Sequence, residues 1–297
     1  MNLLAFDFGG TSVKYSLWDG EKLAAPVDSF LTPATWEETK AKLIEIKEHF
    51  AKEHRLDGAA CSFPGCIVQD TGVIVGYSAI KYIHHFPIRD ELSELFGGIP
   101  VAMENDANCA ALAEVWSGVA KEHKNVLFVV VGTGVGGGIV IDGKIVPGAN
   151  LYGGEWGFMF LNYDETEGGQ ILSALGTAVA MAHRYCDKVN QPRGTYSGRD
   201  VFRLAKEGDE IAAYEVEKFY KYLSVGLFNL QTSFDPETIV IGGGISGSKE
   251  IIDELERRVN HLLVTNNIND FKIDLKPCLY GNDANLIGAV KNFLDRQ

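Results

Sequence analysis

The feature that most constrains the fold of this chain is a pattern that occurs twice, at a constant separation of 123 residues and without a gap. Each copy predicts a strand, a glycine-rich turn, a second strand, an Asp-Gly turn typical of two-residue β-hairpins, and a third strand. The residues in register are Leu4 with Leu127, Gly9 with Gly132, and Asp19-Gly20 with Asp142-Gly143. Because the turn and hairpin glycines coincide, we expect two related lobes. Two such lobes are predicted to face each other across a cleft, which is a favoured place for a ligand.

Runs rich in β-branched and aromatic residues alternate with helical patterns along the chain, which predicts an α/β architecture. Strands are expected at 3–8, 12–18, 59–63, 126–131, 138–146 and 238–241. Helices are expected at 36–54, 105–117, 200–232, 249–263 and 283–294. We predict an N-terminal lobe of residues 1–118, completed by the C-terminal helix 283–297, and a C-terminal lobe of residues 119–282.

Charge and composition narrow the choice of partners. The formal net charge is −13 and the basic residues form no block, so attraction to nucleic acid or to an anionic membrane is disfavoured. The sequence opens on a β-like run rather than a signal peptide, and no apolar stretch approaches the roughly 20 residues that cross a bilayer. Five scattered cysteines suit free thiols in a reducing compartment. We therefore expect a soluble cytoplasmic protein with small-molecule partners, and neither nucleic acid nor a membrane among them.

The first glycine turn follows an acidic residue at a strand end. It reads Asp7-Phe8-Gly9-Gly10-Thr11, with Lys14 in the next strand. Backbone N–H groups in such a turn can point at phosphate oxygens, and Asp7 could orient a hydrated Mg²⁺. An ordinary hairpin turn remains the alternative interpretation.

The second glycine turn runs from Gly132 to Gly138, with Thr133, Gly134 and Gly136 among its residues. A dinucleotide site would require a helix after it, but the sequence continues as a strand, and no P-loop is present. Each glycine costs chain entropy, which favours a backbone that must approach something closely, and phosphate is the natural candidate. A third cluster, Gly242-Gly243-Gly244, lies between a strand and a helix and could hold a nucleoside against bare backbone.

Two carboxylates and two carboxamides lead into an apolar helix at Glu104-Asn105-Asp106-Ala107-Asn108. The helix dipole favours the anionic form of Asp106 in the first turn, which keeps it ready to accept a proton. The alternative is simple N-capping by Asn105 or Asp106. Glu104 is expected to be structural.

These motifs, taken together, resemble the ROK (repressor, open reading frame, kinase) sugar kinases over essentially the whole chain. The matching motifs are Asp7 to Thr11, Pro64-Gly65, Glu104 to Asn108, Gly132 to Gly138, Gly153-Gly154-Glu155 and Gly242 to Ile245. Within that family, the stretch from Glu104 to Gly118 and the pattern from Glu155 to Phe160 are most similar to bacterial β-glucoside kinases.

The resemblance implies an actin-like, ribonuclease-H-like two-lobe ATPase fold, ATP with Mg²⁺, and a homodimer. It implies that Asp106 is the catalytic base and that Asn105 and Glu155 contact sugar hydroxyls, with Gly65 and Phe158 also assigned to the sugar or glycoside. The residues assigned to ATP and its phosphates are Asp7, Gly9, Gly10, Thr11, Lys14, Gly132, Thr133, Gly134, Gly136, Gly243 and Gly244, and Asp7 is assigned to Mg²⁺ through water.

Two features of the family pattern are missing. Many members carry a His and a Cys-x-Cys-Gly loop that hold zinc, whereas this chain has Trp156-Gly157-Phe158 and no paired cysteines after it. Because a structural zinc site needs about four N or S ligands, we expect no zinc site. A second sugar-binding glutamate has no equivalent near Ile171 or Ala174, and Glu165 and Glu167 are the candidates to replace it.

The sequence therefore predicts an ATP-dependent kinase that phosphorylates a hexose or β-glucoside at its 6-hydroxyl. The missing His and Glu would leave a more open, less polar wall around the anomeric carbon, which favours a glycoside over free glucose. The alternatives are a glucokinase, fructokinase or N-acetylmannosamine kinase of the same family, a non-catalytic sugar sensor, and an actin-like ATPase without a sugar pocket.

Overall fold

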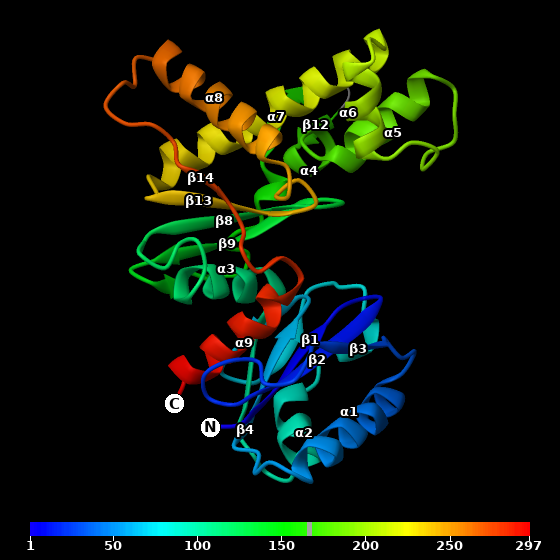
Figure 1. Ribbon diagram of the computed structural model, residues 1–297, viewed down its shortest axis with the longest axis vertical. Helices are drawn as coiled ribbons and strands as arrows, with labels where there is room; N and C mark the ends of the chain where they lie inside the picture. The colour runs from blue at the N-terminus through cyan, green and yellow to red at the C-terminus, as the bar shows by residue number, and fades with distance from the viewer. Residues whose placement is uncertain (165–167) are drawn as a thin grey trace. The chain divides into compact units, whose positions relative to one another are not determined.

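The computed structural model describes residues 1–164 and 168–297 (Figure 1). The chain forms two compact units: unit 1 comprises Met1–Lys121, Pro147–Tyr152 and Leu279–Gln297, and unit 2 comprises Glu122–Val146 and Gly153–Cys278. Within the described ranges, no helix is long and apolar enough to cross a membrane.

Unit 1 is built on a five-stranded sheet in the order β3-β2-β1-β4-β7. The strands are β1 (Leu3–Phe8), β2 (Ser12–Trp18), β3 (Asp28–Leu31), β4 (Gly58–Phe63) and β7 (Val101–Asn105). The remaining elements are the hairpin β5 (Cys66–Val68) and β6 (Val73–Val75), the helices α1 (Trp36–Ala51), α2 (Ile88–Leu95), α3 (Asp106–Trp116) and α9 (Ala284–Asp295), and the 3₁₀ turns η1 (Lys81–Ile83) and η3 (Gly281–Asp283). β1 pairs antiparallel with β2 and parallel with β4, which pairs parallel with β7.

The two faces of this sheet bury different helices, because successive strand residues point to opposite sides. Leu4, Phe6 and Phe8 pack into a core with residues of α1 and α2, which lie on one face (Figure 1). Leu3 and Ala5 pack into a second core with residues of α3 and α9 on the opposite face. By the same alternation, Asp7 at the end of β1 belongs to the α3 and α9 face.

The end of α3 is fixed by a fully buried carboxylate, Glu114. Its Oε1 accepts hydrogen bonds from the backbone N–H groups of Leu279 (2.8 Å) and Tyr280 (3.1 Å), and its Oε2 accepts one from Val119 (3.0 Å). A Cβ at Gly118 would lie 2.2 Å from Glu114 Oε2, so only glycine fits after the helix. Glu114 thus joins α3 to the chain segment that leads into α9.

Unit 2 repeats the same sheet topology in the order β10-β9-β8-β13-β14. The strands are β8 (Val126–Val131), β9 (Val135–Ile141), β10 (Lys144–Ile145), β13 (Thr238–Gly243) and β14 (Leu275–Pro277), with the separate hairpin β11 (Phe160–Asp164) and β12 (Gly168–Ile171). The helices are α4 (Leu172–Leu175), α5 (Ala178–Lys188), α6 (Gly198–Lys206), α7 (Glu210–Phe234) and α8 (Lys249–Thr265), with the 3₁₀ turn η2 (Trp156–Phe158). The labelled helices α4 to α8 lie on one side of the sheet (Figure 1).

The internal repeat of the sequence corresponds to matching strands. β1 and β8 have bounds 123 residues apart, and so do β2 and β9. The Asp142-Gly143 pair forms the expected two-residue hairpin, with positive φ at both residues (51° and 75°). Asp19-Gly20 does not, because Trp18 pairs with Leu23 across a four-residue loop.

Two expected elements differ most from the structure. The strand expected at 138–146 is β9 and β10, and β9 already begins at Val135, so Gly136 to Gly138 belong to a strand rather than to a turn. The helix expected at 200–232 is wrong as a single element. It is split into α6 and α7 by Gly208 (φ 97°) and Asp209, whose side chain accepts from Ala212 N (2.8 Å) as the N-cap of α7.

Candidate functional site

A row of polar residues crosses the carboxyl ends of three strands in unit 1. Asp7 of β1 is paired in register with Ser62 of β4, which is paired with Glu104 of β7. Asp7 is 6% exposed, and its Oδ1 accepts hydrogen bonds from Ser62 Oγ (2.9 Å) and from Asn285 Nδ2 at the start of α9 (3.0 Å). Lys14 Nζ, on the neighbouring β2, lies 3.7 Å from Asp7 Oδ2. These contacts hold the Asp7 carboxylate in one orientation.

The Asp7 carboxylate fits a hydrated Mg²⁺ rather than a metal bound directly by several side chains. Among the described residues, no group of three or more His, Cys, Asp or Glu side chains is placed to hold a metal ion. Mg²⁺ keeps several waters and is usually held by one or two carboxylates together with substrate phosphates. A single oriented carboxylate therefore matches an ion that arrives with a phosphate ligand.

The first glycine turn has a structural explanation of its own. The Gly9 N–H donates to Ser12 O (3.0 Å), and a Cβ at Gly9 would lie 2.9 Å from that oxygen. A Cβ at Gly10 would lie 2.6 Å from the side chain of Ala79. Thr11 is exposed. The two glycines are thus required by packing within unit 1, whatever else this turn contacts.

Asn105, rather than Asp106, caps α3. Asn105 Oδ1 accepts from the backbone N–H groups of Ala107 (2.9 Å) and Asn108 (3.2 Å). Asp106 is the first helical residue, and its Oδ1 accepts from Ala107 N (2.8 Å). Between the two capping alternatives left open by the sequence, the structure therefore favours Asn105.

Gly65 and Glu104 support this helix start. Asn105 Nδ2 donates to Gly65 O (3.1 Å), and Gly65 has φ 102°, where a Cβ would also lie 2.9 Å from Ile74 Cγ2. Glu104 is 7% exposed and accepts from Asn105 N (2.9 Å), Asn108 Nδ2 (3.0 Å) and Gln69 Nε2 (3.0 Å). With these contacts the Glu104 carboxylate orients the β7–α3 junction.

The second glycine turn contains two kinds of glycine. A Cβ at Gly137 would lie 1.8 Å from Phe128 O and 2.4 Å from Trp156 Nε1, so this glycine lets the indole donate to Phe128 O (2.9 Å). In contrast, a Cβ built at Gly132 or Gly136 has no atom of another described residue within 4 Å, its chain neighbours aside. From the sequence, the glycines of this segment are expected to let a phosphate approach the backbone. The packing of Trp156 explains some of them instead.

The segment around Glu155 packs on that glycine-rich strand. A Cβ at Gly154 (φ 91°) would lie 2.4 Å from Gly137 O, so Gly154 also allows close backbone approach. Glu155 directly precedes η2, where Trp156 is buried and Phe158 is 63% exposed. Partial desolvation of the Glu155 carboxyl group raises its pKa above the usual value for glutamate.

Of the remaining turn residues, all but Gly244 contact neighbouring protein atoms. Thr133 O accepts from Thr177 Oγ1 (3.5 Å), and a Cβ at Gly134 would lie 3.2 Å from Ser173 Oγ. A Cβ at Gly243 (φ 81°) would lie 2.3 Å from Val131 O, whereas the position of Gly244 is open. Glu165 and Glu167, the candidates for a second sugar-binding carboxylate, lie outside the described residues.

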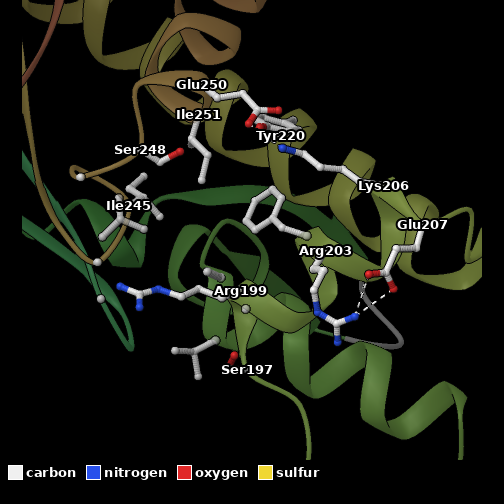
Figure 2. Close-up of a pocket in the computed structure, with 18 residues that line it drawn as sticks. Ser197, Arg199, Arg203, Lys206, Glu207, Tyr220, Ile245, Ser248, Glu250 and Ile251 are labelled. Carbon is white, nitrogen blue, oxygen red and sulfur yellow. Dashed lines mark hydrogen bonds and ion pairs between the residues drawn. The ribbon is translucent and has the colours of Figure 1, made fainter.

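A cavity of about 1030 Å³ opens in unit 2 (Figure 2). Three glycines whose Cβ position is open, Gly132, Gly244 and Gly247, are among its lining residues. Apolar lining residues include Val131, Ala178, Val179, Phe202, Ile245 and Ile251, and polar or charged ones include Ser197, Arg199, Arg203, Lys206, Glu207 and Glu250. Gly132 follows β8 and Gly244 follows β13, and these strands pair in parallel. The cavity therefore lies at the carboxyl ends of adjacent parallel strands, and its volume is in the range of small-molecule sites.

The residues predicted from the sequence form separate groups. In unit 1, Asp7, Glu104 and Asn105 are linked by register and hydrogen bonds, through Ser62, which was not predicted from the sequence. In unit 2, Gly132 and Gly244 line the cavity, but Glu155 and Phe158 do not. The cavity walls from α5 to α8 were missed, because their apolar and charged residues look like those of any amphipathic helix.

Comparison with known proteins agrees with these observations. Residues 3–296 match the ROK family. The chain is 31% identical to a beta-glucoside kinase of Listeria monocytogenes, with 100% of this chain and 99% of the relative covered, and 34% identical to one of Klebsiella pneumoniae, with 99% and 96% covered. A ROK family protein from Streptococcus pneumoniae, solved in complex with sucrose, is 31% identical, with a TM-score of 0.90 and coverage of 100% of this chain and 99% of its own.

The two sheets of mixed strands and their helices thus form an actin-like, two-lobe α/β fold of the kind found in sugar kinases, and the predicted fold class is confirmed. The chain belongs to the ROK family.

Proposed function

We propose that the protein is an ATP-dependent carbohydrate kinase that transfers the γ-phosphate of ATP to the 6-hydroxyl of a β-glucoside. Family membership and the sugar-kinase relatives support the enzyme class. The observation that carries the proposal is the cavity of unit 2, because its volume suits a nucleotide and its lining includes the open glycines Gly132 and Gly244.

The donor site is proposed to hold the base and ribose of ATP against the apolar walls of this cavity. The phosphates would extend over the turn of Gly132, Thr133, Gly134 and Gly136, and over Gly243 and Gly244, where backbone is bare of side chains. In unit 1, Gly9, Gly10, Thr11 and Lys14 are proposed to contact the terminal phosphates. Asp7 would hold a hydrated Mg²⁺, and the bound ion would neutralise charge on the phosphate oxygens.

The acceptor site is proposed to centre on Asp106 as general base. Phosphoryl transfer mainly requires positioning and electrostatic stabilisation, so the base must reach the attacking hydroxyl in a fixed geometry. Asn105 supplies one remaining donor, because its oxygen is used by the cap and one Nδ2 hydrogen by Gly65 O. Gly65 and Glu155 complete the proposed sugar contacts. Asp106 would take the hydroxyl proton as the new P–O bond forms and the bond from the γ-phosphorus to the bridging β,γ-oxygen breaks, with ADP as the leaving group.

Preference for a glycoside is proposed from the residues after Glu155. Where zinc-containing relatives place a His, this chain has Phe158, an exposed aromatic ring that can contact an apolar sugar face or an aryl aglycone. The names of the relatives and the sucrose complex support acceptance of a glucose unit that carries a substituent. We further propose that the enzyme is a homodimer and acts in the cytoplasm, where ATP is available.

The test is a coupled assay of ADP release with glucose, fructose, N-acetylmannosamine, cellobiose and an aryl β-glucoside. Without the missing His and Glu, free glucose loses a hydrogen-bonded contact near its anomeric carbon, which costs about 1 to 3 kcal/mol. We therefore expect kcat/KM for cellobiose to exceed that for glucose by roughly ten- to hundredfold. A higher kcat/KM for glucose or fructose than for every β-glucoside would indicate a general hexose kinase. Binding of sugar without any turnover would indicate a sensor, and ATP hydrolysis that no sugar stimulates would indicate an ATPase.

A further inference from the structure

The cavity of unit 2 is lined by three cationic side chains, and among the residues that the structure describes, two of them have a carboxylate partner and one has none. Arg203 Nη1 forms ion pairs with Glu207 Oε1 (2.9 Å) and Oε2 (2.8 Å). Lys206 Nζ lies 2.6 Å from Glu250 Oε2. Arg199, near the start of α6, makes no hydrogen bond or ion pair with any residue in the described ranges. Its side chain extends away from the Arg203–Glu207 pair (Figure 2).

Arg199 differs from the other charged residues of the cavity, because Arg203 is neutralised by Glu207 and Lys206 by Glu250. The chain as a whole has a formal net charge of −13, so carboxylates are in excess. A guanidinium that lines a largely apolar cavity and still has no carboxylate partner keeps all of its donors for a ligand. Its planar fork of N–H groups matches phosphate and carboxylate oxygens, and charge-assisted contacts of this kind are stronger than neutral hydrogen bonds.

We propose that Arg199 binds a phosphate group of the donor nucleotide, an inference that rests on the proposed function. Arg199, Gly132 and Gly244 line the same cavity, and the phosphates of ATP are proposed to extend over these two glycines, where a Cβ would meet no other side chain. A purine base is uncharged and offers no anionic oxygen, so the phosphate is the part of the nucleotide that a guanidinium recognises by charge. Arg199 thereby makes the affinity of the site depend on the phosphates rather than on the nucleoside alone.

The experiment measures the binding of adenosine, AMP and ADP to the full chain by calorimetry, for the wild type and for Arg199→Ala and Arg199→Lys. Arg193→Ala is the matched control, because it removes the same charge from an exposed ion pair with Asp187 outside the cavity. We expect Arg199→Ala to weaken ADP roughly ten- to hundredfold and adenosine less than about twofold. Arg199→Lys is expected to recover part of the loss, and Arg193→Ala to change neither ligand.

Comparing adenosine, AMP and ADP distinguishes a failure of the inference about Arg199 from a failure of the proposed function. Unchanged ADP binding by Arg199→Ala would overturn the inference and leave the proposed function intact. An equal loss for adenosine and ADP would also overturn it, because stacking on the base or a structural role would then explain the effect. A wild-type protein that binds no adenine nucleotide would overturn the proposed function itself.

Discussion

Replacement of Asp106 by Asn separates the chemical role of this residue from its place in the helix. The substitution keeps the size of the side chain and an oxygen that can accept from Ala107 N, a bond that measures 2.8 Å in the structure. The cap of α3 is unaffected, because it is formed by Asn105. The carboxamide, however, cannot take the proton of the sugar hydroxyl. The structure thus predicts a folded protein with an inactive base.

The expected loss of activity in Asp106→Asn is much larger than the expected loss of stability. General-base catalysis contributes about two to four orders of magnitude, or about 2.7 to 5.4 kcal/mol in the activation free energy. Loss of a favourable charge at a helix N-terminus changes the free energy of unfolding by only about 0.3 to 1 kcal/mol. Turnover should therefore fall far more than stability, and sugar binding should largely persist.

The assay measures kcat with cellobiose and ATP. The free energy of unfolding in urea and the affinity for the sugar are measured on the same preparations. Asn105→Ala is the contrasting variant. It removes the cap and the bond to Gly65 O, so it should lower the free energy of unfolding by about 1 kcal/mol or more. A well-folded Asp106→Asn protein with kcat within a few-fold of the wild type would refute the assignment of Asp106 as base.

Three further outcomes are expected. Metal analysis of the purified protein should find no stoichiometric zinc, and activity should return when Mg²⁺ is restored after chelation; about one tightly bound zinc per chain would contradict this. Glu114→Ala leaves three partly buried backbone N–H groups without their acceptor and should lower the free energy of unfolding by about 2 to 4 kcal/mol in urea titrations, whereas Glu207→Ala on the surface should cost less than about 1 kcal/mol. Because the pKa of Glu155 is raised and its ionised form is proposed to bind the sugar, KM should rise as the pH falls, starting at a higher pH than for an ordinary glutamate; a KM profile unchanged in Glu155→Gln would remove Glu155 from this role.

The strands of the two repeats could be predicted from the sequence because each is a short run rich in apolar, β-branched or aromatic residues. β1, β2 and β8 have the expected bounds, since both faces of these strands are largely buried and nothing else explains such runs. β7 was not predicted, because its sequence Val101–Asn105 mixes apolar and polar residues. The lobe boundary expected between residues 118 and 119 stays a prediction.

Helix ends were harder to predict than helix cores. The apolar spacing of α6 and α7 continues through Gly208, so the pattern alone suggested a single helix. Tertiary packing overrides that pattern, because Tyr185 OH donates to Asp209 Oδ2 (2.8 Å) while Asp209 also caps α7. A glycine followed by a capping residue was the available signal for this break.

The glycine turns show why a motif can be recognised from sequence while the role of each residue cannot. Every glycine of a motif looks alike in the sequence, but Gly10, Gly137 and Gly243 are required because a Cβ would collide with protein atoms. Gly132 and Gly244 meet no such atom, and both line the cavity. A position that is glycine without an internal packing reason is one where a ligand can supply the reason. The assignment of phosphate contacts is therefore best supported at these two positions, where Arg199 also lines the cavity and adds the charge that bare backbone lacks.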